Sequence, residues 1–162
     1  MAYFDNAATT FPKPNIVYDF MRDFYKNSGA NVGRGHYGMA QSAAALIKDT
    51  RERLQNLLHC PAKQVVFTPT ATIALNIIIQ GLIKKGVRSV YISPFEHNAV
   101  TRTLHYFEEK GDIVVNKLYV NRELGYDLER IRFQFDDIKP DLVIISHASN
   151  VIGLVAPIEE VF

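Results

Sequence analysis

Short apolar runs alternate with longer helical segments along the chain, and this alternation most limits how it can fold. Runs rich in apolar and β-branched residues predict strands at residues 64–68, 89–93, 113–120 and 141–146. Helical spacing and helix-ending signals predict helices at residues 15–27, 40–58, 71–85, 98–110, 128–138 and 157–162. Such alternation predicts crossover connections. The expected fold class is α/β, three-layer, with a mostly parallel sheet and flanking helices.

Composition excludes several classes of protein. Hydrophobic residues make up 48% and charged residues 22% of the 162 residues, and the net charge is +1. These values are typical of globular proteins and exclude disorder. We expect no nucleic-acid partner, because no strong basic excess is present. We also expect no membrane segment, since no run approaches the roughly 20 apolar residues that a spanning helix needs.

The sequence also gives expectations about the cellular compartment of the protein and about whether the chain is part of a longer one. The N-terminus has neither a basic nor an apolar secretory region, and a single cysteine cannot form an internal disulfide. A cytoplasmic protein is therefore expected. The helix predicted at 157–162 stops before it can cross to another strand. We interpret the sequence as the front part of a longer chain, or as a truncated relative of one.

Ligands of such sheets bind beyond the carboxyl ends of the strands, so three segments are candidate sites. The helix beginning at Ala71 can hold a phosphate on its free amides, helped by the Thr72 hydroxyl, although Thr70 can instead act as an ordinary N-cap. His97 follows the second predicted strand and can be structural or functional. Residues 147–150 follow the last strand and can form a turn or part of a site.

Metal binding and hydrolase chemistry have little support in the sequence. The five histidines show no metal-ligand spacing, so no metal is expected. No G-x-S-x-G elbow is present. Cys60 precedes a proline at a predicted helix end, which indicates a structural role.

Taken in order, several motifs resemble one family. They are YFDNAATTFPKP at residues 3–14, NVGRG at 31–35, the turn at 71–72, EHNAV at 96–100 and HASNVIG at 147–153. Their order and rough spacing resemble the start of the cysteine desulfurases, in the class V aminotransferase group. The resemblance implies the incomplete large domain of a pyridoxal 5′-phosphate (PLP) dependent transferase of fold type I.

The resemblance also implies roles for individual residues. His97 would be catalytic, stacking on the cofactor ring and assisting proton transfers. Three further cofactor-binding residues are implied: Ala71 and Thr72 at the phosphate, and Asn150 at the ring oxygen. The implied substrate-binding residues are Asn6, Ala7, Ala8 and Arg34, with the Arg34 loop near a dimer interface.

The implied domain organisation has two parts. Residues 1–35 would form the N-terminal segment and helix of the small-domain or interface region. Residues 36–162 would form the first, truncated part of the PLP-binding large domain. The chain departs from the family pattern at the phosphate turn, where Thr70 replaces a glycine and Ile73 replaces a glutamate.

The implied function is that of the N-terminal part of a cysteine desulfurase-like enzyme, which moves sulfur from L-cysteine to an enzyme persulfide and releases alanine. The family's pyridinium-partner aspartate, Schiff-base lysine and nucleophilic cysteine lie beyond the matched motifs, so this chain alone is expected to be inactive. The expected partners are L-cysteine or a related amino acid, a second copy in a homodimer, and a sulfur-acceptor protein. The alternatives are another class V reaction, either an aminotransferase or a selenocysteine lyase, and a non-catalytic truncated assembly module.

Overall fold

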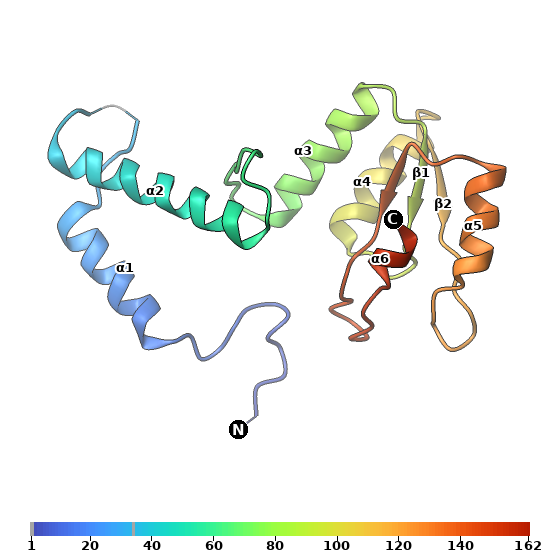
Figure 1. Ribbon diagram of the computed structural model, residues 1–162, viewed down its shortest axis with the longest axis horizontal. Helices are drawn as coiled ribbons and strands as arrows, with labels where there is room; N and C mark the ends of the chain where they lie inside the picture. The colour runs from blue at the N-terminus through green and yellow to red at the C-terminus, as the bar shows by residue number, and fades with distance from the viewer. Residues whose placement is uncertain (1, 34) are drawn as a thin grey trace. The chain divides into compact units, whose positions relative to one another are not determined.

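The chain divides into two compact units, Met1–Phe67 and Thr68–Phe162. The computed structural model describes residues 2–33 and 35–162 (Figure 1). The boundary expected near residue 35, between an interface segment and a large domain, stays a prediction.

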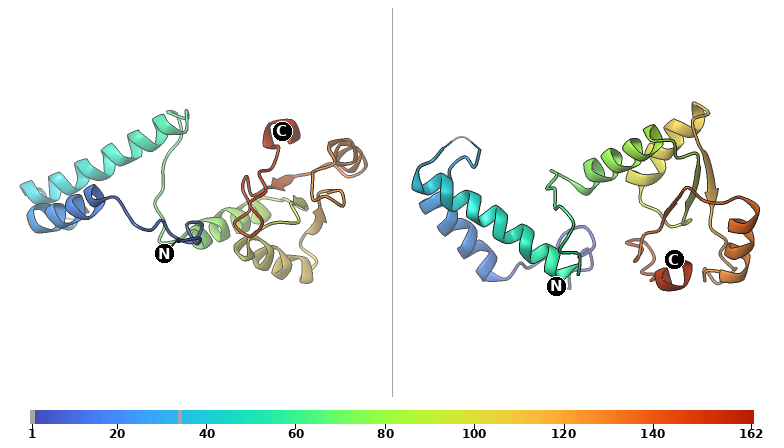
Figure 2. Two further views of the ribbon diagram at one scale, coloured as in Figure 1. Left: turned by 90° about the horizontal axis from the view of Figure 1, so that it is seen from below. Right: turned by 45° about the horizontal axis from the view of Figure 1, so that its top comes forward.

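The first unit consists of two helices that lie side by side, α1 (Asn15–Ser28) and α2 (Gly38–Leu57) (Figure 2). Both were predicted from their helical spacing. Ala40 and Ala43 are the buried residues of α2, and none of the residues of α1 is buried. Large apolar side chains on α1 are exposed, among them Ile16 and Phe20. The unit taken by itself therefore buries little apolar surface.

The strand predicted at residues 64–68 is wrong. Within the part of the chain that the structure describes, this segment pairs with no strand. Val66 is 76% exposed, and the Arg51 guanidinium lies 5.6 Å from the centre of the Phe67 ring. A β-rich run becomes a strand only when a neighbouring strand takes up its backbone hydrogen bonds.

The second unit is an α/β unit whose elements follow the predicted order. They are α3 (Ala71–Lys84), β1 (Ser89–Ile92), α4 (Asn98–Glu109), β2 (Val114–Lys117), α5 (Leu128–Asp137), β3 (Leu142–Ile144) and α6 (Ile158–Val161). The strand order is β2-β1-β3, and both strand pairs are parallel. The central residue Tyr91 pairs with Asn116 on one side and with Val143 on the other. The parallel sheet is thus confirmed.

Helices cover both faces of this sheet, which confirms the three layers (Figure 1). On one face, Ile79 of α3 and Leu104 of α4 pack against Val90 and other aliphatic residues of the sheet. On the other face, Tyr91 packs with Ile131 of α5. The alternation of side chains along β1 sends Val90 and Tyr91 to opposite faces.

The ends of the helices agree with their sequence signals. Asp127 caps α5 by accepting a hydrogen bond from the backbone amide of Arg130 at 3.1 Å. Gly86 follows the end of α3 with φ of 109°, and Gly111 follows α4 with φ of 74°. Both angles lie in the left-handed region that glycine adopts without strain.

The run at residues 141–146 is apolar without alternation, which predicts a fully buried strand, and this prediction is wrong. Leu142, Val143 and Ile144 are each half-buried. The reason is position, because β3 is an edge strand of the three described strands rather than a central one. Apolar composition without alternation therefore did not distinguish the edge from the centre of the sheet.

The carboxylate of Asp141 fastens the start of β3 to the start of β1. It accepts hydrogen bonds from the backbone amides of Arg88 at 2.8 Å and Ser89 at 3.0 Å. The hydrogen bond from Ser89, followed by that from Arg88, lowers the pKa of Asp141 below its usual 3.8. A group whose pKa is lowered by folding stabilises the protein above its unfolded pKa, and this contribution is lost as the pH falls through its folded pKa.

We therefore expect Asp141→Asn to lower the free energy of unfolding at neutral pH. The difference from the original chain should shrink as the pH falls below 3.8. Urea unfolding of both proteins across this range measures it. A difference that stays constant down to the most acidic pH would contradict the prediction.

Candidate functional site

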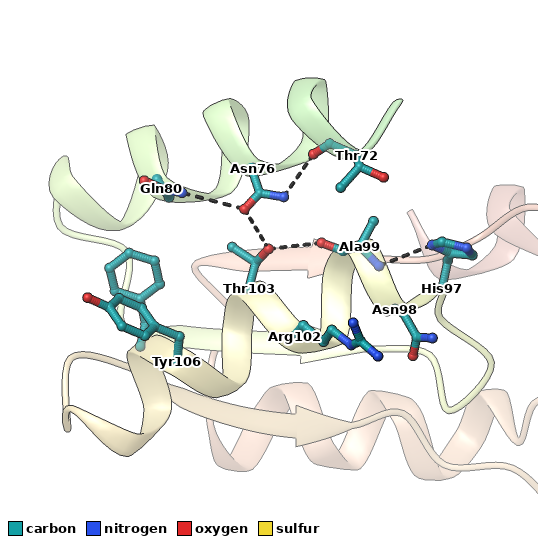
Figure 3. A pocket seen from close by; sticks show the side chains of 10 residues that line it. Thr72, Asn76, Gln80, His97, Asn98, Ala99, Arg102, Thr103 and Tyr106 are labelled. Carbon is teal, nitrogen blue, oxygen red and sulfur yellow. Dashed lines mark hydrogen bonds between the residues drawn. The ribbon is translucent and has the colours of Figure 1, made fainter. Parts of the chain in front are cut away.

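The first turns of α3 and α4 border a single cavity of about 590 Å³ (Figure 3). Its volume lies within the range of small-molecule sites. Helix α3 contributes Thr72, Asn76 and Gln80 to the lining, and the α4 side contributes His97, Arg102 and Thr103 among others.

The topology explains why these two helix ends meet. Helix α4 begins a few residues beyond the carboxyl end of β1, and α3 runs back to the amino end of the same strand. In a right-handed crossover the helices run antiparallel to the strands, so both helix N-termini lie toward the carboxyl edge of the sheet. This is the edge at which open parallel sheets bind ligands.

The N-terminus of α3 has a cap and also two free amides. The Thr70 hydroxyl accepts a hydrogen bond from the Ile73 amide at 3.2 Å, which confirms its expected role as an N-cap. Among the described residues, the backbone amides of Ala71 and Thr72 have no acceptor. Capping therefore leaves two amides at the positive end of the helix dipole available to an anion.

His97 is the N-cap of α4, and its ring is held by that cap. Its Nδ1 accepts a hydrogen bond from the Ala99 amide at 3.0 Å. A ring nitrogen that accepts carries no proton, so the proton of the neutral ring is assigned to Nε2. The cap thus fixes the plane of an exposed ring and leaves Nε2 as the free nitrogen.

The neighbouring residue Glu96 joins the loops that follow β1 and β3. Its Oε1 accepts hydrogen bonds from the Ser93 hydroxyl at 2.6 Å and the Ser146 amide at 2.5 Å. Its Oε2 accepts from the Ser146 hydroxyl at 2.8 Å. Burial, together with the nearby Glu96 carboxylate, raises the pKa of Tyr126. We call Glu96, Ser93 and Ser146 the carboxylate clasp.

The loop after β3 is folded on itself. The hydroxyl of the buried Ser149 accepts a hydrogen bond from the Val151 amide at 3.3 Å, and Ala148 forms a backbone bridge with Val155. Asn150 lies exposed in this turn and is not part of the cavity lining. The structure therefore brings Thr72 and His97 to one cavity, and it connects the start of the Asn150 loop to the His97 loop through the carboxylate clasp.

The residues expected to line a substrate pocket belong to the other compact unit. There the Asn6 side chain accepts a hydrogen bond from the Phe11 amide at 3.2 Å. Ala7 and Ala8 are exposed in the turn around it. Arg34 lies outside the described residues. The substrate-binding role of these four residues stays a prediction.

Five polar residues of the cavity lining were not predicted from the sequence: Asn76, Gln80, Arg102, Thr103 and Tyr106. The sequence does contain a signal for Asn76. Thr72, Asn76 and Gln80 recur at intervals of four in an otherwise apolar helix, which places them on one face. No comparable signal marks Thr103, because threonine is common on helix surfaces.

Two features are absent from residues 2–33 and 35–162. No group of three or more His, Cys, Asp or Glu side chains is placed to hold a metal ion. None of the helices is long and apolar enough to cross a membrane.

Residues 2–162 match the family Aminotransferase class-V, and the chain belongs to that family. Within it, the chain corresponds to the N-terminal portion of cysteine desulfurase-like proteins. It is 32% identical to the cysteine desulfurase SufS of Plasmodium falciparum, over 99% of this chain and 30% of that protein. It is 30% identical to a cysteine desulfurase of Haloferax volcanii, over 99% of this chain and 38% of that protein.

Solved structures give the same result. The apo cysteine desulfurase of Thermococcus onnurineus has a TM-score of 0.89 and 25% identity, over 98% of this chain and 40% of that one. A structure described as SspA in complex with cysteine has a TM-score of 0.83 and 29% identity, over 99% of this chain and 46% of that one. The chain thus spans less than half the length of these relatives.

The family is PLP-dependent, and the cavity suits such a group. Two free amides and the Thr72 hydroxyl can receive a phosphate, and the fixed imidazole of His97 offers a flat surface to a ring. Arg102 adds a positive charge, and no acidic residue is present among the described residues of the lining. The residues present therefore fit the cofactor.

Proposed function

We propose that this chain forms the cofactor-holding part of a PLP-dependent cysteine desulfurase, which takes sulfur from L-cysteine, leaves it as a persulfide and releases alanine. One observation carries the proposal: Thr72, whose amide is free, and the capped ring of His97 line the same cavity. The names of the relatives, and the cysteine complex of one structural neighbour, support L-cysteine as the substrate.

In this proposal the phosphate binds the amides of Ala71 and Thr72 and the Thr72 hydroxyl, where the helix dipole stabilises its negative charge. Arg102, on the α4 side of the cavity, adds to the positive potential. The His97 ring stacks on the pyridine ring, and its Nε2 proton is available for transfer to or from the substrate. Asn150 would then approach from the loop after β3 to reach the ring oxygen.

When bound, PLP supplies an electron sink for the bond changes at the amino acid. The chain's own residues bind the phosphate, orient the ring and hold a proton at His97 Nε2. We propose that Asn6, Ala7, Ala8 and Arg34, in the interface segment 1–35, contact the substrate. We expect residues 1–162 alone to give no turnover, because the family's Schiff-base lysine, pyridinium-partner aspartate and nucleophilic cysteine lie beyond the matched motifs. Homodimer formation and a sulfur-acceptor protein are further parts of the proposal.

The cofactor site can be tested without turnover. We expect the chain to bind pyridoxamine 5′-phosphate at least about tenfold more tightly than pyridoxamine, because charge-assisted hydrogen bonds to the phosphate contribute about 1.5–3 kcal/mol each. Isothermal titration calorimetry measures both affinities. The amine form is the suitable probe, since it has no aldehyde to react with surface lysines.

His97→Ala serves as the second arm of this test. This variant should weaken the binding of both ligands, because it removes the side chain that contacts the ring and leaves the phosphate site in place. Thr101→Val, on the same helix but outside the cavity lining, should leave both affinities unchanged. Equal binding of pyridoxamine with and without its phosphate would overturn the proposed site.

A further inference from the structure

A single polar pair interrupts the apolar contact between α3 and α4. Around it, Ile79 and Ile83 of α3 pack with Val100 and Leu104 of α4. Within the same interface, the Thr103 hydroxyl donates to Asn76 Oδ1 at 2.9 Å. Thr103 is only 8% exposed and Asn76 is half-buried, so this hydrogen bond is partly shielded from water. We call Asn76 and Thr103 the polar bridge.

The geometry fixes which atom donates. Asn76 Nδ2 lies 2.8 Å from the Thr72 carbonyl oxygen, which can only accept, so the amide group must face it with nitrogen. Asn76 Oδ1 is then the acceptor for Thr103 Oγ1. That hydroxyl also lies 2.9 Å from the Ala99 carbonyl oxygen. Every polar atom of the bridge therefore has a partner.

The bridge reaches both halves of the candidate site (Figure 3). On α3, Asn76 holds the carbonyl of Thr72, whose amide is one of the two free donors. On α4, Thr103 contacts the carbonyl of Ala99, and the amide of Ala99 donates to His97 Nδ1. A connected set of polar contacts thus runs from Thr72 to the imidazole of His97, in which the single Thr103 hydroxyl proton is shared between Asn76 Oδ1 and the Ala99 carbonyl.

Aliphatic contacts alone define the register of two helices weakly, because leucine and isoleucine side chains can repack at small cost. A hydrogen bond between the helices is different, because it is directional: sliding α3 along α4 would break it and leave each partner only the contacts within its own helix, Thr103 with the Ala99 carbonyl and Asn76 with Gln80. The polar bridge therefore penalises displacement of α3 along α4, and such a displacement would change the distance between the free amides and the His97 ring.

We propose that Asn76 and Thr103 are positioning residues, which set the spacing between the phosphate-binding amides of α3 and the ring-binding His97 of α4. This inference rests on the proposed function. Neither residue needs to touch the reacting atoms. The expected consequence is specific: the bridge matters for a ligand that spans both half-sites, and much less for a ligand that occupies one.

The test compares ligands of different reach on the same variants of the full 162-residue chain. We expect Thr103→Val to weaken the binding of pyridoxamine 5′-phosphate up to about tenfold, because the net contribution of one hydrogen bond is of that order. The same variant should change the affinities for pyridoxamine and for inorganic phosphate by less than about twofold. Thr103→Ser should restore binding, since it returns the hydroxyl. Thr101→Val is the matched control, with the same chemical change on the same helix.

A double variant separates positioning from stability. In Asn76→Leu/Thr103→Val both partners are apolar, so the thermal midpoint should recover relative to Thr103→Val. We expect pyridoxamine 5′-phosphate binding to stay about tenfold weak despite this recovery. If affinity returned together with the midpoint, the bridge would be merely structural and the inference would be overturned.

Failure of the proposed function and failure of the inference about the polar bridge give different results. If the unsubstituted chain binds pyridoxamine with and without its phosphate equally, the proposed function is overturned, and this inference with it. If the unsubstituted chain prefers the phosphorylated ligand and Thr103→Val keeps that preference in full, the inference about the bridge alone is overturned.

Discussion

Replacing Glu96 with alanine is expected to lower the free energy of unfolding by about 2–3 kcal/mol, because hydrogen bonds to a charged group are among the stronger ones and their loss leaves partners unpaired. The substitution removes the acceptor of three hydrogen bonds, two of them from Ser146. The third donor, the Ser93 hydroxyl, is completely buried and would have no water to replace the lost bond. Urea unfolding followed by circular dichroism measures the change.

Glu96→Gln is the matched control for this prediction. The glutamine oxygen can still accept from the Ser146 amide and the Ser93 hydroxyl. Its NH₂ group can donate to the Ser146 hydroxyl, which is able to turn and accept. We therefore expect a loss of less than about 1 kcal/mol, the size of an ordinary neutral hydrogen bond. Equal losses for alanine and glutamine would show that the negative charge of Glu96, and not its hydrogen-bond geometry, stabilises the loops.

The carboxylate clasp also connects stability to the proposed site. Glu96 immediately precedes His97, and Ser146 immediately precedes the loop that carries Asn150. The clasp therefore holds the two segments in place before a ligand binds. Such preorganisation lowers the ordering cost of binding. Loosening it should weaken cofactor binding in addition to lowering stability.

The architecture of the α/β unit could be predicted from the sequence because local signals and fold agree there. Thr70 and Asp127 cap the helices that their positions predict. Gly86 and Gly111 adopt the left-handed conformation just past the ends of α3 and α4. Each signal acts through hydrogen bonds or backbone angles within a few residues, so it needs no knowledge of the rest of the chain.

Predictions that depended on distant partners were the ones that failed. The segment at residues 64–68 has strand composition, but no strand among the described residues pairs with it. The half-burial of β3 follows from its place at a sheet edge, which composition does not encode. Both errors concern which segments are neighbours in the sheet.

In the candidate site, too, local signals could be read from the sequence, whereas contacts between distant segments could not. Ala71, Thr72 and His97 could be identified as candidate site residues from the sequence, because they lie near predicted helix starts and strand ends. That Glu96 reaches Ser146, fifty residues later, and that Asn76 meets Thr103 across a helix interface could not be read from spacing. The sequence thus indicates the ligand-facing residues, whereas the residues that hold them in position emerge only from the fold.

Two neighbouring isoleucines on α3 provide the other large expected effect. Ile79 is 1% exposed and packs in the core between α3, α4 and the sheet, whereas Ile78 is 56% exposed. We expect Ile79→Ala to lower the free energy of unfolding by about 2–5 kcal/mol, through lost burial and the cavity left behind. Ile78→Ala should change it by no more than about 0.5 kcal/mol, as is usual for exposed positions.

Because the two variants delete the same atoms one residue apart on the same helix, helix propensity and the unfolded chain contribute almost equally to both. The difference between their unfolding free energies, measured by urea unfolding, therefore reports burial in this core alone. It also bears on the site, since Ile79 lies about one turn from Asn76 and packs against the helix that carries Thr103. Similar losses for Ile78→Ala and Ile79→Ala would contradict the packing of α3 on the sheet, and with it the placement of the α3 amides beside His97.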